Sequence, residues 1–146
     1  HRLRKDSGLP GMKVLEFAFS GPDNAYLPHQ YPDSRCICYT GTHDNDTAAG
    51  WYASATPQEK AYARKYLGVE RDDAQTVCRA LLRAGQGSIA ELFVAQMQDY
   101  LGLGSEARVN VPGVPRGNWS WRMEPGKTTD ALADAIRDLT HTFGRC

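Results

Sequence analysis

The sequence contains no apolar run that approaches the length of a bilayer-spanning helix, so we expect no membrane partner. It also lacks an excess of either charge, because 17 Lys and Arg residues balance 17 Asp and Glu residues among 146 in total. A balanced charge gives no electrostatic reason to bind nucleic acid, and we expect none. The charged amino end, residues 1–6, is followed by no apolar segment and does not have the pattern of a signal peptide.

The cysteines in this sequence have no metal-binding spacing. The four cysteines are Cys36, Cys38, Cys78 and Cys146, and no Cys-x-x-Cys pair of the zinc type occurs. Cys36 and Cys38 are too close in sequence to form a comfortable disulfide, and on a strand they point to the same face. We therefore expect buried, reduced thiols and a cytoplasmic protein.

The elements that are present favour an α/β fold in one domain, with hydrophobic content of 41% and charged content of 23%. Nearly continuous apolar runs predict strands at residues 12–19, 35–40 and 92–98, covered on both faces as in a parallel sheet. A capping box with Pro at the first helical position predicts a helix from Thr56 to Gly68. Other patterns predict a helix from Asp72 or Asp73 to Gly85, a helical turn at 88–91 and a last helix over 130–143.

The segment from Tyr39 to Thr47 places four polar residues in a row where the second expected strand ends. These residues are His43, Asp44, Asn45 and Asp46. In α/β folds, catalytic groups collect at the carboxyl ends of strands, so we expect a functional site here. The alternatives are a polar network that caps a helix, or a transition-metal site of His43, Asp44 and His29. No Gly-x-Ser-x-Gly elbow occurs to supply a nucleophilic serine.

Sugar chemistry fits this segment better than these alternatives. A short aspartate can accept bonds from two vicinal hydroxyls, a neighbouring histidine can donate to one, and glycosyl transfer needs carboxylates around its reacting centre. The sequence also has a long loop, residues 102–126, and loops of that length are usually functional. Aromatic residues that could stack on sugars are Tyr26, Tyr31, Trp51, Trp119 and Trp121. We expect Trp119 or Trp121 to anchor the loop.

Five segments in register carry a resemblance to a known family. They are residues 9–19 (LPGMKVLEFAF), 26–29 (YLPH), 39–47 (YTGTHDNDT), 101–108 (LGLGSEAR) and 117–122 (GNWSWR). Together they resemble 4-alpha-glucanotransferase, the amylomaltase or disproportionating enzyme of glycoside hydrolase family 77. The resemblance implies an eight-stranded (β/α)8 barrel of the α-amylase type, in which the three expected strands are the sixth, seventh and eighth.

The resemblance also implies roles for individual residues. Asp44 matches the aspartate that stabilises the transition state, and His43 matches a neighbouring histidine that binds sugar hydroxyls. Phe17 matches an aromatic residue near the site, and Asn110 matches a sugar contact in the last loop. The nucleophilic aspartate and the acid/base glutamate would lie on strands upstream of His1. Glu16 stands where the family usually has Gln, and Asp99, at the end of the third expected strand, offers no substitute for the missing pair.

We therefore expect residues 1–146 to be the carboxyl-terminal part of one catalytic barrel. The complete enzyme would transfer a segment of an α-1,4-glucan to the 4-hydroxyl of another glucan or of glucose, with retention and without a cofactor or a metal. It would be cytoplasmic, or plastidial in a plant or alga. The alternatives are a glucan-binding module without catalysis, and a metal-dependent hydrolase that uses His43, Asp44 and His29.

Overall fold

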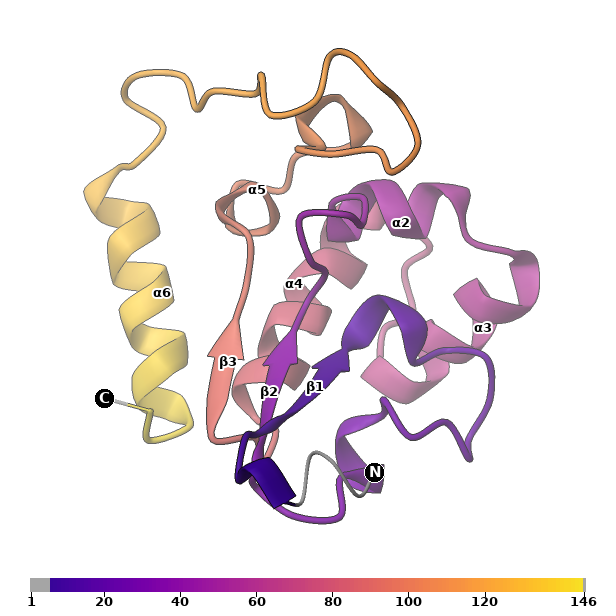
Figure 1. Ribbon diagram of the computed structural model, residues 1–146. Coiled ribbons are helices and arrows are strands. Elements are labelled where there is room, and N and C mark those ends of the chain that lie inside the picture. The colour runs from indigo at the N-terminus through magenta and orange to yellow at the C-terminus, as the bar shows by residue number, and fades with distance from the viewer. Residues whose placement is uncertain (1–5, 146) are drawn as a thin grey trace.

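Three short parallel strands form the sheet in this computed structural model, which describes residues 6–145. Strand β1 (Gly11–Val14) pairs with β2 (Cys36–Tyr39), and β2 pairs with β3 (Leu92–Val94), so that β2 is central. The register aligns Gly11 with Cys36 and Ile37 with Leu92. All three strands run in the same direction, and their carboxyl ends meet at one edge (Figure 1). The expected α/β class with a parallel sheet is confirmed.

Two of the strands end earlier than their apolar runs suggest. After Val14 the chain turns into the 3-10 helix η1 (Leu15–Phe17), and after Val94 it turns into helix α5 (Met97–Tyr100). The predicted strands 12–19 and 92–98 were therefore wrong in their second halves. The physical reason in the first case is that Leu15 and Ala18 are both buried at i, i+3 spacing, so the apolar run fills the core from a helical turn.

The region between β2 and β3 contains one helix that the sequence analysis missed. Helix α2 (Ala48–Ser54) begins where the Thr47 hydroxyl accepts a hydrogen bond from the Gly50 N–H. The predicted helical turn at residues 88–91 was wrong. There the Glu91 N–H donates to the carbonyl oxygens of Ser34 and Cys36, which draws the chain into the sheet.

The remaining helices confirm the local signals. Helix α3 (Pro57–Leu67) has the predicted capping box between Thr56 and Glu59 and ends at Gly68 in the left-handed region. Helix α4 (Ala74–Gln86) is capped by Asp73, and helix α6 (Asp130–Thr142) is capped by Thr129. Two short 3-10 segments, η2 (Pro28–Gln30) and η3 (Ser105–Ala107), lie in the crossover to β2 and in the long loop. None of the helices among the described residues is long and apolar enough to cross a membrane.

The core lies between one face of the sheet and helix α4. Cys36 and Cys38 point into it from β2 and are free thiols, as expected, whereas Cys146 lies outside the described residues. The apolar stripe of α4 covers this face through Val77, Cys78, Leu81 and Leu82. At Gly85 a side chain would have its Cβ 2.0 Å from the Phe93 ring, so glycine permits the close approach of α4 to β3.

The opposite face of the sheet carries apolar side chains but no covering helix from residues 6–145 (Figure 1). Its residues are exposed or half-buried, namely Met12, Ile37, Tyr39, Leu92 and Val94. The expectation of cover on both faces is therefore not met within the described part of the chain. Helix α6 is also incompletely covered by the described residues, because none of its residues is buried.

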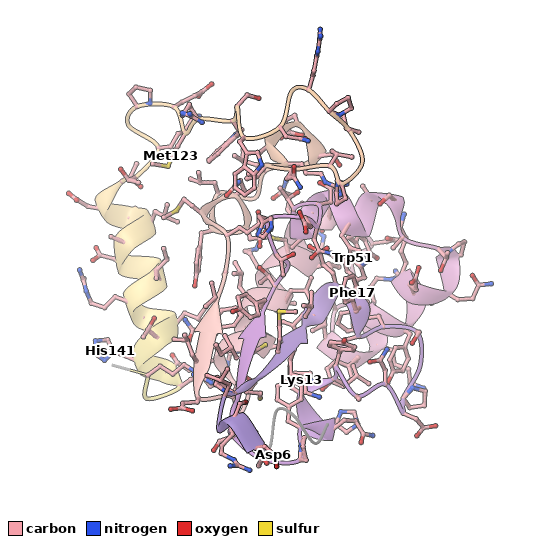
Figure 2. All side chains as sticks on the ribbon, viewed as in Figure 1. Asp6, Lys13, Phe17, Trp51, Met123 and His141 are labelled. Carbon is pink, nitrogen blue, oxygen red and sulfur yellow. The ribbon has the colours of Figure 1, made fainter. Side chains whose placement is uncertain are left out.

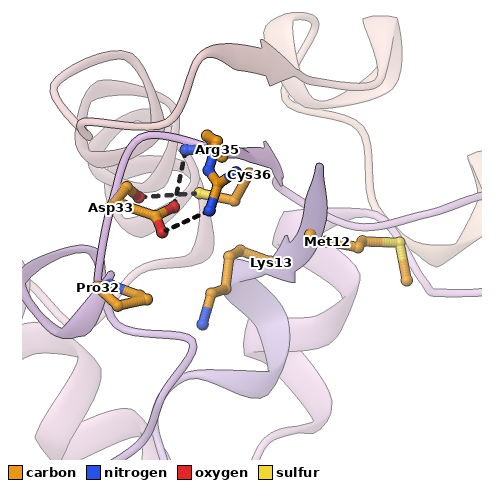
Figure 3. Close-up of a pocket in the computed structure, with 7 residues that line it drawn as sticks. Met12, Lys13, Pro32, Asp33, Arg35 and Cys36 are labelled. Carbon is orange, nitrogen blue, oxygen red and sulfur yellow. Dashed lines mark hydrogen bonds and ion pairs between the residues drawn. The ribbon is translucent and has the colours of Figure 1, made fainter. Parts of the chain in front are cut away.

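The amino ends of β1 and β2 border a separate hollow, shown in Figure 3. Arg35 and Asp33 form an ion pair at one wall of this hollow, with 3.8 Å between the charged atoms. Lys13 donates to the Ala25 carbonyl and lies 5.2 Å from the Tyr31 ring centre. In α/β folds the amino-terminal edge of a parallel sheet serves stability, so we assign these contacts to holding the crossover segment in place.

Candidate functional site

The segment after β2 forms a tight turn that presents His43 and Asp44 at its tip. The Thr42 N–H and hydroxyl both donate to the Asn45 side-chain oxygen, at 3.0 and 2.8 Å, and the Asn45 N–H donates back to the Thr42 carbonyl. These local bonds close the turn at the carboxyl edge of the sheet. The side chains of His43 and Asp44 remain 57% and 51% exposed, so they are available to a ligand.

The Asp44 carboxylate is oriented by two neighbours. The Asn110 side-chain N–H donates to Asp44 Oδ1 at 2.6 Å, and His43 Nε2 lies 3.3 Å from the same oxygen. The second oxygen, Oδ2, takes no hydrogen bond from residues 6–145. One carboxylate oxygen is thus fixed by the protein while the other can accept bonds from a ligand.

The long loop, residues 102–126, reaches back to this turn. Arg108 donates to the backbone carbonyl of Asp44 at 2.7 Å and to that of Asn110 at 2.9 Å. It therefore ties the loop to the turn and places Asn110 beside Asp44. The bond between Asn110 and Asp44 joins residues 66 positions apart, so no local pattern in the sequence could predict it.

Aromatic side chains surround the pair, although not all of the expected ones. The Trp119 ring lies 5.2 Å from the His43 ring and is 58% exposed, in a backbone conformation (φ 61°) that is unusual for a non-glycine residue. Trp121 is half-buried and lines a hollow with Leu101 and Met123. Tyr31 is a core residue instead, since its side chain is buried and its hydroxyl donates to the Cys38 sulfur.

Phe17 and Trp51 form the other wall of the site, and Figure 2 shows them close to one another. They line one hollow together with Asp44 and Arg108. Phe17 is 52% exposed and packs edge to face with Tyr26 at 5.9 Å. Trp51 is half-buried against Phe19. The structure thus brings Phe17, His43, Asp44 and Asn110, the four site residues expected from the sequence, to one edge of the sheet.

His29 does not join this site. Its Nδ1 atom lies 3.1 Å from the Tyr66 hydroxyl, on the side of helix α3. Among residues 6–145, no three His, Cys, Asp or Glu side chains are arranged to hold a metal ion. The metal site of His43, Asp44 and His29 that the sequence left open is therefore not assembled in this structure.

Two buried acids beneath the turn were not recognised as part of the site. The Asp99 carboxylate accepts bonds from the Thr40 hydroxyl at 2.5 Å and from the Ala48 N–H at 2.8 Å, so it joins β2, α2 and α5. Burial raises the pKa of Asp99. Glu16 is 5% exposed, and burial, helped by the charges of Asp99 and Asp46, raises its pKa to about 9. A signal existed for Glu16, because a charged residue stands within an apolar run.

We expect Asp99 to contribute to the stability of the folded protein. Replacing it with Ala leaves the Thr40 hydroxyl and the Ala48 N–H buried without their partner, which costs about 2–4 kcal/mol. The free energy of unfolding of the full-length protein in urea measures this loss. The matched control is Asp138→Ala on the exposed side of α6, which we expect to change it by less than about 0.5 kcal/mol. Equal stability of both variants would contradict the assigned role.

Comparison with known proteins identifies the family. The sequence profile of the 4-alpha-glucanotransferases, glycoside hydrolase family 77, matches residues 1–129. The chain belongs to this family. It is 54% identical to the 4-alpha-glucanotransferase of Thermus thermophilus over 98% of its own length, and 41% identical to that of Clostridium butyricum over 99%. These matches cover 30% and 29% of the two relatives, so the chain spans less than a third of their length.

Solved amylomaltase structures agree with this family assignment. The amylomaltase of Streptococcus agalactiae, solved in complex with acarbose, superposes with a TM-score of 0.91 at 32% identity, over 99% of this chain and 29% of that one. The amylomaltase of Corynebacterium glutamicum, at 16% identity and a TM-score of 0.55, shows the likeness of fold alone. The 4-alpha-glucanotransferase relatives also include a chloroplastic enzyme of Arabidopsis thaliana, at 43% identity over 98% of this chain and 25% of that enzyme.

Proposed function

We propose that this chain is the carboxyl-terminal part of the catalytic barrel of a 4-alpha-glucanotransferase. The observation that carries the proposal is the Asp44 carboxylate at the carboxyl edge of a parallel sheet, with one oxygen fixed by Asn110 and the other without a donor among residues 6–145. Catalytic groups of (β/α)8 barrels lie at this edge. The family assignment supports the proposed reaction, and the placement of Asp44 supports its proposed role.

The uncovered surfaces of the structure support the barrel. In a closed barrel the inner face of every strand packs against the inner faces of the others. The face made by Met12, Ile37, Tyr39, Leu92 and Val94 is apolar and is not covered by the described residues. β1 and β3 are also sheet edges, which barrels eliminate by closure. We assign both edges and this face to contact with upstream strands of the same domain.

The proposed reaction divides between the two parts of the domain. Upstream residues supply the nucleophilic aspartate, which forms a covalent glycosyl intermediate, and the acid/base glutamate, which protonates the leaving oxygen. Asp44 accepts hydrogen bonds from hydroxyls of the sugar at the cleavage point, and its negative charge stabilises the oxocarbenium-like transition state. His43 donates to a neighbouring hydroxyl, and Phe17 and Trp119 contact the apolar faces of the sugars. Transfer to a 4-hydroxyl then occurs with retention and requires no cofactor.

The proposal has a direct test. The full-length protein, incubated with maltotriose, should release glucose and form longer maltooligosaccharides, and the new bonds should have the α configuration by NMR. Activity should be unchanged by EDTA, whereas a metal-dependent hydrolase would lose it. Binding of maltooligosaccharides without any change in their length would instead favour the glucan-binding module. We place the enzyme in the cytoplasm, or in the plastid if the source is a plant or alga.

Asn110 provides a second test of the same site. Its side-chain N–H holds Asp44 Oδ1, so Asn110→Ala should lower kcat about tenfold, the typical value of one hydrogen bond to a charged group. Asn110→Asp should lower kcat further, because it places a second negative charge against Asp44. Steady-state kinetics of maltotriose disproportionation provide the comparison. If Asn110→Asp were the more active of the two variants, Asn110 would not orient Asp44 in the way proposed.

A further inference from the structure

Glu16 lies directly beneath the turn that carries His43 and Asp44. Its backbone N–H donates to the Thr40 carbonyl at 3.1 Å, which fixes η1 to the end of β2. Its carboxyl group lies against Gly41, where an added Cβ would be only 2.5 Å from Glu16 Oε1. The carboxyl group therefore fills the space that a side chain at position 41 would need, and the turn packs against this group.

The carboxyl group is in a place that disfavours a negative charge. Its Oε1 atom is buried and has no hydrogen-bond partner among residues 6–145. The ionisable groups that face it are Asp99 from α5, Asp46 from the turn, the Cys78 thiol from α4 and Arg108 from the long loop. Of the groups named, which belong to the described residues, Arg108 alone favours ionisation, and burial outweighs it. Because the pKa of Glu16 is raised to about 9, the group is a neutral acid at neutral pH.

The same residue borders the candidate site. Glu16 lines the hollow that Phe17, Asp44 and Arg108 also line. Gly41, which rests on the Glu16 carboxyl, is three residues before Asp44, and Asn45, on the other side of Asp44, also lies close to this position. We therefore expect a change in the volume or charge of the Glu16 side chain to alter the position of the Asp44 carboxylate, because both belong to contacts of a single closed turn.

We propose that Glu16 is a positioning residue of the glucanotransferase site, whose carboxyl group supports Gly41 and thereby holds the turn that presents His43 and Asp44. This inference rests on the proposed function. Glu16 does not need to touch the substrate in this role. Ionisation would place a negative charge beneath the turn, next to Asp46 and Asp99, and would displace the turn from its active position.

The direction of the pH dependence follows from linkage. The folded protein keeps the Glu16 proton up to about pH 9, whereas the unfolded chain loses it near the ordinary value of 4.5. Between these values the folded state binds more protons than the unfolded state, so the stability that Glu16 contributes falls as pH rises through this window and is constant above it. Glu16→Gln cannot ionise and should lack this slope in a series of melting temperatures.

The decisive experiment measures kcat and KM for maltotriose in the full-length protein from pH 6 to pH 10. Glu16→Ala should lower kcat about tenfold at pH 7 with little change in KM, and Glu16→Gln, which keeps the size and the neutral state, should restore most of it. The ratio of kcat in Glu16→Gln to kcat in the wild type should be flat from pH 6 to 8. Above about pH 9 it should rise roughly tenfold per pH unit, because all other titrations are common to both proteins.

The matched control is Glu91→Gln, an exposed glutamate before β3, whose kcat ratio to the wild type should stay flat over the whole range. Thermal unfolding at each pH verifies that every variant is folded at the assay temperature. A flat ratio for Glu16→Gln up to pH 10, or wild-type kcat in Glu16→Ala, would overturn the proposal. Failure of the proposed function is a different result, namely a folded wild type that does not disproportionate maltotriose at any pH.

Discussion

Asp44→Asn in the full-length protein is expected to lower kcat for maltotriose disproportionation by about 10²–10³-fold, equivalent to roughly 3–4 kcal/mol of transition-state stabilisation. The amide has the size of the carboxylate and can still accept the bond from Asn110, so the turn should persist. What is lost is the negative charge facing the developing positive charge of the sugar. KM should change much less than kcat, because the charge of the sugar develops only in the transition state.

The comparison needs a variant with the same chemical change in another place. Asp138→Asn on the exposed side of α6 removes a carboxylate of the same type, and we expect wild-type kcat from it. Far-ultraviolet circular dichroism and a melting curve would show that both variants are folded. A folded Asp44→Asn protein with nearly normal kcat would exclude Asp44 as the stabilising carboxylate and would remove the main support for the proposed function.

The 146-residue chain expressed alone is expected to have no measurable disproportionating activity and no cooperative melting transition. Its sheet has two open edges and one apolar face that the described residues leave uncovered, which are the features of an incomplete barrel. It also lacks the proposed nucleophile and acid/base, so no covalent intermediate forms and Asp44 has no developing charge to stabilise. Mass spectrometry, a thermal melt and glucose release from maltotriose test the three parts of this expectation.

Fragment complementation provides the positive control for the expected inactivity of the chain alone. Co-expression of the chain with the upstream part of the same polypeptide should give a soluble complex with transferase activity, and Asp44→Asn in the short fragment should abolish most of it. If the chain alone melted cooperatively and transferred glucose in an Asp44-dependent way, it would carry its own catalytic pair. The division of the site between two parts of a barrel would then be wrong.

Glu16 shows where sequence reasoning was incomplete. The sequence indicated only that Glu16 stands where the family usually has Gln. The structure gives it more weight, because the side chain is buried, lies against Gly41 and has an oxygen without a hydrogen-bond partner in the described part of the chain. The apolar neighbours of Glu16 already indicated burial. They could not indicate that the carboxyl group would face Asp99 and Asp46, which belong to other segments.

His29 and Asn110 show the same limit of sequence-based prediction in two opposite ways. The chemistry of His29 suits a metal site with His43 and Asp44, but its segment folds against helix α3 and pairs with Tyr66. Asn110 was expected to contact sugar only through the family resemblance, and the structure shows its side chain donating to Asp44. Residue type shows which chemistry a side chain can perform, whereas the path of the chain decides which partners it has.

The sequence by itself determined the features that arise from local interactions. These include the capping box of α3, the apolar stripe of α4, the extent of α6 and the position of His43 and Asp44 after a strand, because each depends on residues within a few positions of one another. Only the tertiary structure decided that the apolar runs after Val14 and Val94 turn into helical segments, and that Asp99, Glu16 and Arg108 gather beneath and around the turn. Those outcomes depend on contacts between distant segments, which compete with local propensity and are absent from any short window of the sequence.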